Sequence, residues 1–128
     1  MRYAELAERS DYAMRNARVL ARRAYTALHD GEPAVPDLPD VLTELAGAVD
    51  KLTAELTREG DLSRARAAIV DVVAHAKVMS AKAGSDTDAP ALGTSEQVLV
   101  AQVRSIALDL LQATGLSRDE ARTAMHSR

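Results

Sequence analysis

Three histidines, a row of arginines and one isolated arginine are the residues of this sequence best suited to chemistry. The histidines are His29, His75 and His126, and the sequence contains no Glu-x-x-His pair of the kind that builds di-metal sites in helical bundles. Cysteine is absent, which excludes thiolate catalysis and cysteine-ligated zinc. Ser105 has no histidine within helical reach to activate it. We therefore predict no catalytic residue, no metal site and no cofactor, and a protein that is not an enzyme.

The row of arginines falls on one face of a long predicted helix, opposite its main apolar seam. It consists of Arg15, Arg18 and Arg22, and Asp11 lies four residues before the first of them. That spacing lets Asp11 and Arg15 neutralise each other across one helical turn. Two interpretations stay open for the row: a solvated face, or a docking strip for an acidic partner or for anionic lipid head groups.

The isolated arginine is Arg104, which stands among Val100, Leu108 and Leu111 in an apolar segment. A buried guanidinium group needs a carboxylate or several carbonyl groups as partners. One interpretation is a side chain whose charged end reaches the edge of the bundle. The other is an anion site inside the bundle, which makes Arg104 the candidate ligand-binding residue.

Composition limits the function classes further. The formal net charge of −3 argues against a general nucleic-acid binder, which usually carries an excess of Lys and Arg. No window approaches the roughly 20 apolar residues of a membrane span, and the first residues lack the apolar stretch of a signal peptide. We therefore predict a single cytoplasmic domain over residues 1–128, whose membrane association would depend on a partner or on surface charge.

Apolar residues recur at alternating steps of three and four along most of the chain, which is the helical pattern. It predicts helices over about 2–29, 39–59, 62–83, 95–114 and 117–126. The short Gly60–Asp61 link makes the second and third helices antiparallel neighbours. Ser117 and Glu120 have the spacing of a capping box at the start of the last helix. The predicted fold is all-α: an antiparallel four-helix bundle with a short C-terminal fifth helix.

The first predicted helix has a wider apolar face than one neighbouring helix can cover. Beside its main seam lies a second stripe that consists of Ala7, Met14, Ala21, Tyr25 and Leu28. A face this wide contacts either two neighbours in the bundle or one neighbour and a partner chain. We therefore expect a homo-oligomer that forms through this stripe.

The helix over 95–114 is the most apolar of the five, and we expect Leu110 to be among its essential core residues. One narrow polar strip interrupts it, formed by Gln102, Ser105, Asp109 and Gln112. This strip is either the solvent-facing line of the helix or a polar seam that specifies how the helix aligns with a neighbour. The sequence leaves both interpretations open.

Two stretches resemble a known family. They are residues 15–24 (RNARVLARRA) and residues 100–116 (VAQVRSIALDLLQATGL), and a proline-rich linker and a leucine-rich helix lie between them. Together they resemble the soluble helical portion of FUSC-family proteins, the fusaric acid resistance or aromatic acid exporter-like membrane proteins. The resemblance covers about residues 11–116 and implies a cytoplasmic helical part that accompanies transmembrane helices. This chain lacks the transmembrane part, and the resemblance implies no catalytic residues.

The hypothesis that follows is a non-enzymatic helical interaction domain, associated with an exporter-like protein. It would present helix faces to a copy of itself, to a membrane protein or to an anionic membrane surface. The residues assigned to this interaction are Met14, Arg15, Arg18, Ala21, Arg22, Tyr25 and Leu28. The alternative is a bundle that binds a small molecule, with an anion site near Arg104.

Overall fold

A computed structural model describes residues 3–31, 37–58, 60–85 and 94–127. Within these ranges the chain forms five helices: α1 (Tyr3–His29), α2 (Leu38–Thr57), α3 (Ser63–Ser85), α4 (Thr94–Ala113) and α5 (Arg118–His126). The predicted all-α class is confirmed, and every helix begins and ends within two residues of its predicted bounds.

Local sequence explains where the helices begin and end. Gly31 (φ 69°) and Gly115 (φ 99°) follow α1 and α4 in the left-handed conformation that glycine adopts without steric cost. The Asp61 carboxylate accepts hydrogen bonds from both the backbone N–H and the hydroxyl of Ser63 at the start of α3. The predicted capping box is confirmed, because Ser117 and Glu120 exchange side-chain to backbone hydrogen bonds at the start of α5.

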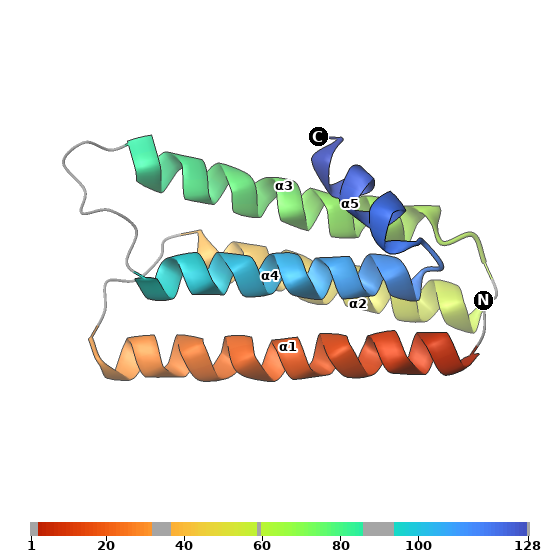
Figure 1. Cartoon of the computed structure of the whole chain (residues 1–128), viewed down its shortest axis with the longest axis horizontal. Coiled ribbons are helices and arrows are strands. Elements are labelled where there is room, and N and C mark those ends of the chain that lie inside the picture. The colour runs from red at the N-terminus through yellow and green to blue at the C-terminus, as the bar shows by residue number, and fades with distance from the viewer. Residues whose placement is uncertain (1–2, 32–36, 59, 86–93, 128) are drawn as a thin grey trace.

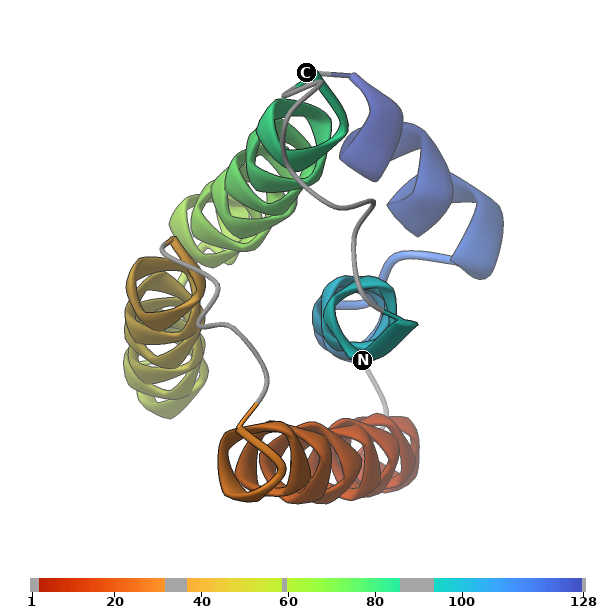
Figure 2. The ribbon, with the colours of Figure 1, turned by 90° about the vertical axis from the view of Figure 1, so that its left-hand side faces the viewer.

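The four long helices run in alternating directions, and the short α5 crosses the others at an angle (Figure 1). Seen end-on, α4 lies at the centre of the molecule (Figure 2). It packs against α1 on one side and against α3 and α5 on the other, while α2 packs mainly against α3. The antiparallel bundle with a short fifth helix is therefore confirmed.

The tightest packing lies between α2, α3 and α4. The largest fully buried side chains all belong to these three helices: Ile69, Leu111, Val41, Val72, Val73 and Val103. A polar contact fixes the end of α4, where the Arg66 guanidinium group donates to the Thr114 hydroxyl (2.9 Å) and carbonyl (2.6 Å). Because Thr114 is buried, this arginine satisfies a carbonyl group that α4 leaves unpaired at its end.

The packing between α1 and α2 is different, although these helices follow each other in the chain. α1 contacts α4 extensively, whereas it makes almost no close backbone approach to α2. The edge of the bundle between α1 and α2 is therefore not closed by backbone contacts. None of the described helices has the length and apolar character needed to cross a membrane.

Candidate functional site: an apolar groove between α1 and α2

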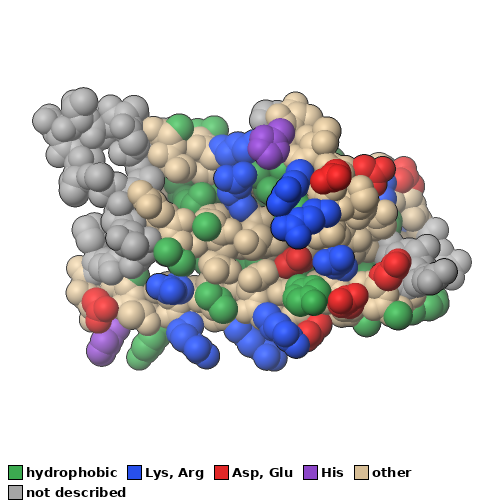
Figure 3. All heavy atoms as spheres, in the orientation of Figure 1, with side chains coloured by type: hydrophobic (Ala, Val, Ile, Leu, Met, Phe, Trp, Pro, Cys, Tyr) green, Lys and Arg blue, Asp and Glu red, His purple; other side chains and the backbone are tan. Residues whose placement is uncertain are grey.

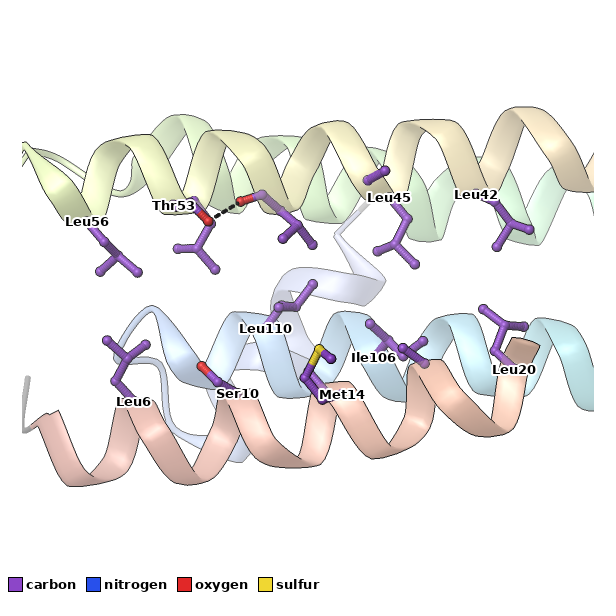
Figure 4. Close-up of a pocket in the computed structure, with 15 residues that line it drawn as sticks. Leu6, Ser10, Met14, Leu20, Leu42, Leu45, Thr53, Leu56, Ile106 and Leu110 are labelled. Atoms are coloured by element: carbon purple, nitrogen blue, oxygen red, sulfur yellow. Dashed lines mark hydrogen bonds between the residues drawn. The ribbon is translucent and has the colours of Figure 1, made fainter. Parts of the chain in front are cut away.

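The open edge of the bundle is an apolar groove of about 340 Å³. Its walls are α1 and α2, and α4 forms its floor. It is lined by Leu6, Ser10, Ala13, Met14, Ala17, Leu20, Leu42, Leu45, Ala46, Val49, Leu52, Thr53, Leu56, Ile106 and Leu110. Figure 4 shows side chains of α1 and α2 facing each other across it, with Ile106 and Leu110 of α4 between them. A groove of this composition favours an apolar occupant.

Side-chain size explains why the groove stays open. On the α1 wall, Ser10, Ala13 and Ala17 are too short to reach across to the leucines of α2. On the α2 wall, the Thr53 hydroxyl donates to the Val49 carbonyl (3.0 Å), so its hydrogen-bonding capacity is satisfied within its own helix. Thr53 therefore needs no polar ligand in the groove, and Ser10 is exposed to solvent.

An exposed apolar band continues from the groove over the outer side of α1. Tyr3 is 88% exposed, Met14 56% and Tyr25 70%. Of the predicted second stripe, only Met14 lines the groove, and Ala7 and Ala21 are exposed beyond it. Tyr25 stacks on His29 with 6.1 Å between ring centroids. Leu28 belongs to α1, but its side chain lies outside the described part of the structure.

The arginine row lies along the solvent-facing side of α1, where Figure 3 shows Lys and Arg side chains along the lower edge of the molecule. Arg15 pairs with Asp11 at 2.9 Å, as the four-residue spacing predicts, and its guanidinium group lies 5.9 Å from the centre of the Tyr12 ring. Arg18 and Arg22 are exposed and form no ion pair with any described residue. The bundle therefore does not need these two charges for its own packing.

Arg104 is exposed rather than buried, which corrects the expectation of an anion site inside the bundle. Its face of α4 turns away from α1, and its side chain lines a separate surface pocket between α4 and α5. The apolar groove and the arginine therefore belong to different sides of α4. The exposure of Arg104 agrees with the other interpretation, a side chain whose charged end reaches the edge of the bundle.

The polar strip of α4 divides between two environments. Asp109 is half-buried against α1 and accepts a 2.7 Å hydrogen bond from the Asn16 amide, whereas Ser105 lines the pocket beside Arg104. Burial raises the pKa of Asp109, and the Asn16 hydrogen bond and the charges of Arg9 and Arg118 oppose that rise. The polar-seam interpretation therefore holds at Asp109, which aligns α4 with α1.

The histidines remain separate from one another. His75 on α3 contacts the Glu44 carboxylate on α2 at 2.9 Å, a pairing between distant segments that sequence spacing does not reveal. The His126 Nδ1–H donates to the Arg122 carbonyl (2.7 Å) within α5. Among the described residues, no three His, Asp or Glu side chains come together in a way that would hold a metal ion.

The sequence is similar to an uncharacterized protein of Corynebacterium glutamicum. The two are 34% identical over 111 residues, which is 87% of this chain but 28% of the relative. The chain thus spans little more than a quarter of the protein that it matches. No family model matches the sequence, and no solved structure matches it either.

Proposed function

We propose that this chain is a non-enzymatic interaction domain that associates with a second copy of itself through α1. In this arrangement the apolar band of α1 in each copy lies against the α1–α2 groove of the other. The single observation that carries the proposal is the apolar groove itself, which no helix covers among the described residues. Exposed apolar surfaces of this kind mark interaction sites in soluble proteins.

Burial of apolar surface is the driving force. The groove leaves Met14 and Val49 exposed by 56% and 37%, and each square ångström of apolar surface removed from water contributes about 25 cal/mol. A helix laid in the groove would contact α1, α2 and the floor of α4 at once. It would thereby cover the exposed surface of Met14 and Val49 on the two walls.

A second copy is the occupant that best fits the surface. A two-fold pairing needs one surface that is complementary to itself, and here the exposed helix face and the groove adjoin on one molecule.

Sedimentation velocity at micromolar concentrations tests this proposal with a matched pair of variants. Met14→Glu places a charge in the groove, whereas Val78→Glu places the same charge on α3 at an exposed valine outside the groove. We expect the parent chain and Val78→Glu to sediment as a dimer and Met14→Glu as a monomer. A monomeric parent chain, or a dimer that survives Met14→Glu, would contradict the proposal.

The resemblance to FUSC-family proteins extends the proposal to a membrane setting. Such a domain would bring copies of a membrane protein together at its cytoplasmic side, with Arg15, Arg18 and Arg22 toward the anionic inner leaflet. The exposure of these arginines supports this orientation. Flotation with vesicles that contain phosphatidylserine tests it: binding should weaken with salt and after Arg18→Gln/Arg22→Gln. Absence of salt-sensitive binding would leave the arginine row as a solvated face.

A further inference from the structure

A second concave site lies on the opposite side of α4 from the groove. It is a surface pocket of about 400 Å³ where α5 crosses α4, and it is lined by Arg104, Ser105, Leu108, Arg122, Met125 and His126. On the face seen in Figure 3, basic side chains and a histidine gather near the end of α5, and the acidic side chains lie toward its start. Basic and apolar groups thus share one hollow, which we call the α4–α5 pocket.

The described lining of the α4–α5 pocket carries basic groups and no acidic one. Neither Arg104 nor Arg122 forms an ion pair with any described residue. The two arginines come from different helices, 18 positions apart in the sequence, and the fold brings them to one site. An anion in this pocket would therefore meet two cationic groups that are free to pair with it.

The position of α5 is fixed by polar contacts that leave the pocket groups available. The Lys77 ammonium group on α3 donates to the Met125 carbonyl (2.6 Å), which holds the end of α5 against α3. The Nδ1–H of His126 is already bonded to the Arg122 carbonyl. The Nε2 atom is therefore the histidine group left to interact with a ligand, as an acceptor when the ring is neutral and as a donor when it is charged.

We infer that the α4–α5 pocket binds a phosphate monoester with a compact apolar group. A carboxylate is satisfied by one guanidinium fork, whereas a tetrahedral phosphate offers three oxygens and up to two charges. Arg104, Arg122 and the Ser105 hydroxyl supply donors for these oxygens, and the His126 Nε2 atom forms a hydrogen bond with the ester. The apolar group of the ester would lie on Leu108 and Met125.

Titration of the full chain with phenyl phosphate at constant ionic strength tests this inference, followed by amide chemical shifts. Saturable shifts should be confined to the end of α5 and the adjacent turns of α4. Arg104→Gln/Arg122→Gln should weaken binding by at least about tenfold, because a hydrogen bond to a charged group contributes about 1.5–3 kcal/mol. The control is Arg18→Gln/Arg22→Gln, which removes the same charge from exposed arginines of α1 and should leave binding unchanged.

A second arm distinguishes a free ester from a lipid head group. Vesicles that contain phosphatidate present the same phosphate monoester at a membrane surface, and phosphatidylserine vesicles of matched charge serve as their control. The inference is supported when the pocket variant loses binding of phenyl phosphate, or loses a preference for phosphatidate over phosphatidylserine, and the α1 variant keeps it. Absence of both phenyl phosphate binding and a phosphatidate preference in the parent, or equal loss in both variants, overturns it. Thermal melts of the two variants, compared with the parent, verify that the fold is intact.

Discussion

The two sides of α4 meet very different surroundings. Toward α3 and α5 it packs against complementary side chains, so that Val103, Ala107 and Leu111 are fully or almost fully buried. Toward α1 and α2, it forms the floor of a groove whose walls do not touch. The same helix therefore completes a packed core on one side and, on the other, underlies a groove in which Met14 of α1 and Val49 of α2 remain exposed.

The difference comes from side-chain size rather than from polarity. α3 contributes Ile69, Val72 and Val73 at the points where it meets its neighbours, and these branched side chains fill the space between helices. Half of the α1 residues that line the groove are small, namely Ser10, Ala13 and Ala17. Small residues normally let helices approach closely, but α1 already packs against α4, so it does not also reach α2. The unfilled space is where we place the second copy.

The largest expected loss of stability comes from a substitution in the packed core on the α3 side of the bundle. We predict that Ile69→Ala destabilises the protein by about 2–5 kcal/mol, because it opens a cavity in a site with no exposure to solvent. Leu42→Ala on the groove wall, where the side chain is half-buried, should cost about 1 kcal/mol or less. Urea unfolding of dilute protein measures both. Equal losses at the two sites would mean that the groove is packed as tightly as the core.

Leu110 belongs to both regions, because it is buried in the core and also lines the floor of the groove. We predict that Leu110→Ala costs about 2–3 kcal/mol, at the lower end of the range for buried leucine. The space left by truncation opens into the groove rather than forming a sealed cavity. An unfolding midpoint equal to that of the parent would place Leu110 outside the core and contradict the described bundle.

A substitution that fills the groove should increase the stability of the protein instead of decreasing it. Ser10→Leu adds an apolar side chain to the α1 wall, where nothing opposes it, and should stabilise the isolated chain by about 1 kcal/mol. It should also weaken self-association, because the added side chain occupies the space meant for the second copy. A thermal melt measures the change in stability, and a dilution series measures self-association. Tighter self-association would contradict the placement of the second copy in the groove.

The smallest effect concerns the polar contact between α1 and α4. Because burial raises the pKa of Asp109, the folded protein binds more protons than the unfolded chain just above the ordinary range of this carboxyl group. Its contribution to stability therefore decreases as the pH rises through that window. Asp109→Asn keeps an acceptor for Asn16 and removes the charge.

We accordingly expect Asp109→Asn to match or exceed the parent in stability at neutral pH, by less than about 1 kcal/mol. The advantage should disappear at low pH, where the parent carboxyl group is protonated. Asp61 and Glu120, whose pKa values are lowered by hydrogen bonds from Ser63 and Ser117, act in the opposite direction in both proteins and cancel in the difference. Unfolding of both proteins at several pH values between acidic and neutral measures this difference in stability. A clear loss of stability at neutral pH would show that the charge itself is needed.

Sequence patterns predicted the helices well because their signals are local. The spacing of apolar residues, the glycines at the helix ends and the Ser117–Glu120 capping box all act within a few residues. The wide apolar face of α1 also drew attention to Met14 and Tyr25 before any contact was known. Both side chains are exposed in the structure.

The groove and the α4–α5 pocket depend on contacts between distant segments, and local patterns do not determine these. Whether α1 packs on α2 or on α4 is set by the whole bundle, and both choices suit its apolar seam. The angle at which α5 crosses α4 brings Arg122 and His126 to Arg104, although the sequence places them far apart. For the same reason, the sequence of α4 alone left open whether Arg104 reaches the edge of the bundle or lies inside it.

The absence of cysteine permits the most direct test of the proposed pairing. A nitroxide spin label attached at Thr53→Cys, on the groove wall, would be mixed with isotopically labelled chain that carries no spin label. Only contacts between copies then broaden the amide signals. We predict broadening along α1 around Ser10 to Ala21 and none around Val78 on α3. Undiminished signals along α1, or broadening centred on α3 or α5, would contradict the seating of α1 in the groove of a second copy.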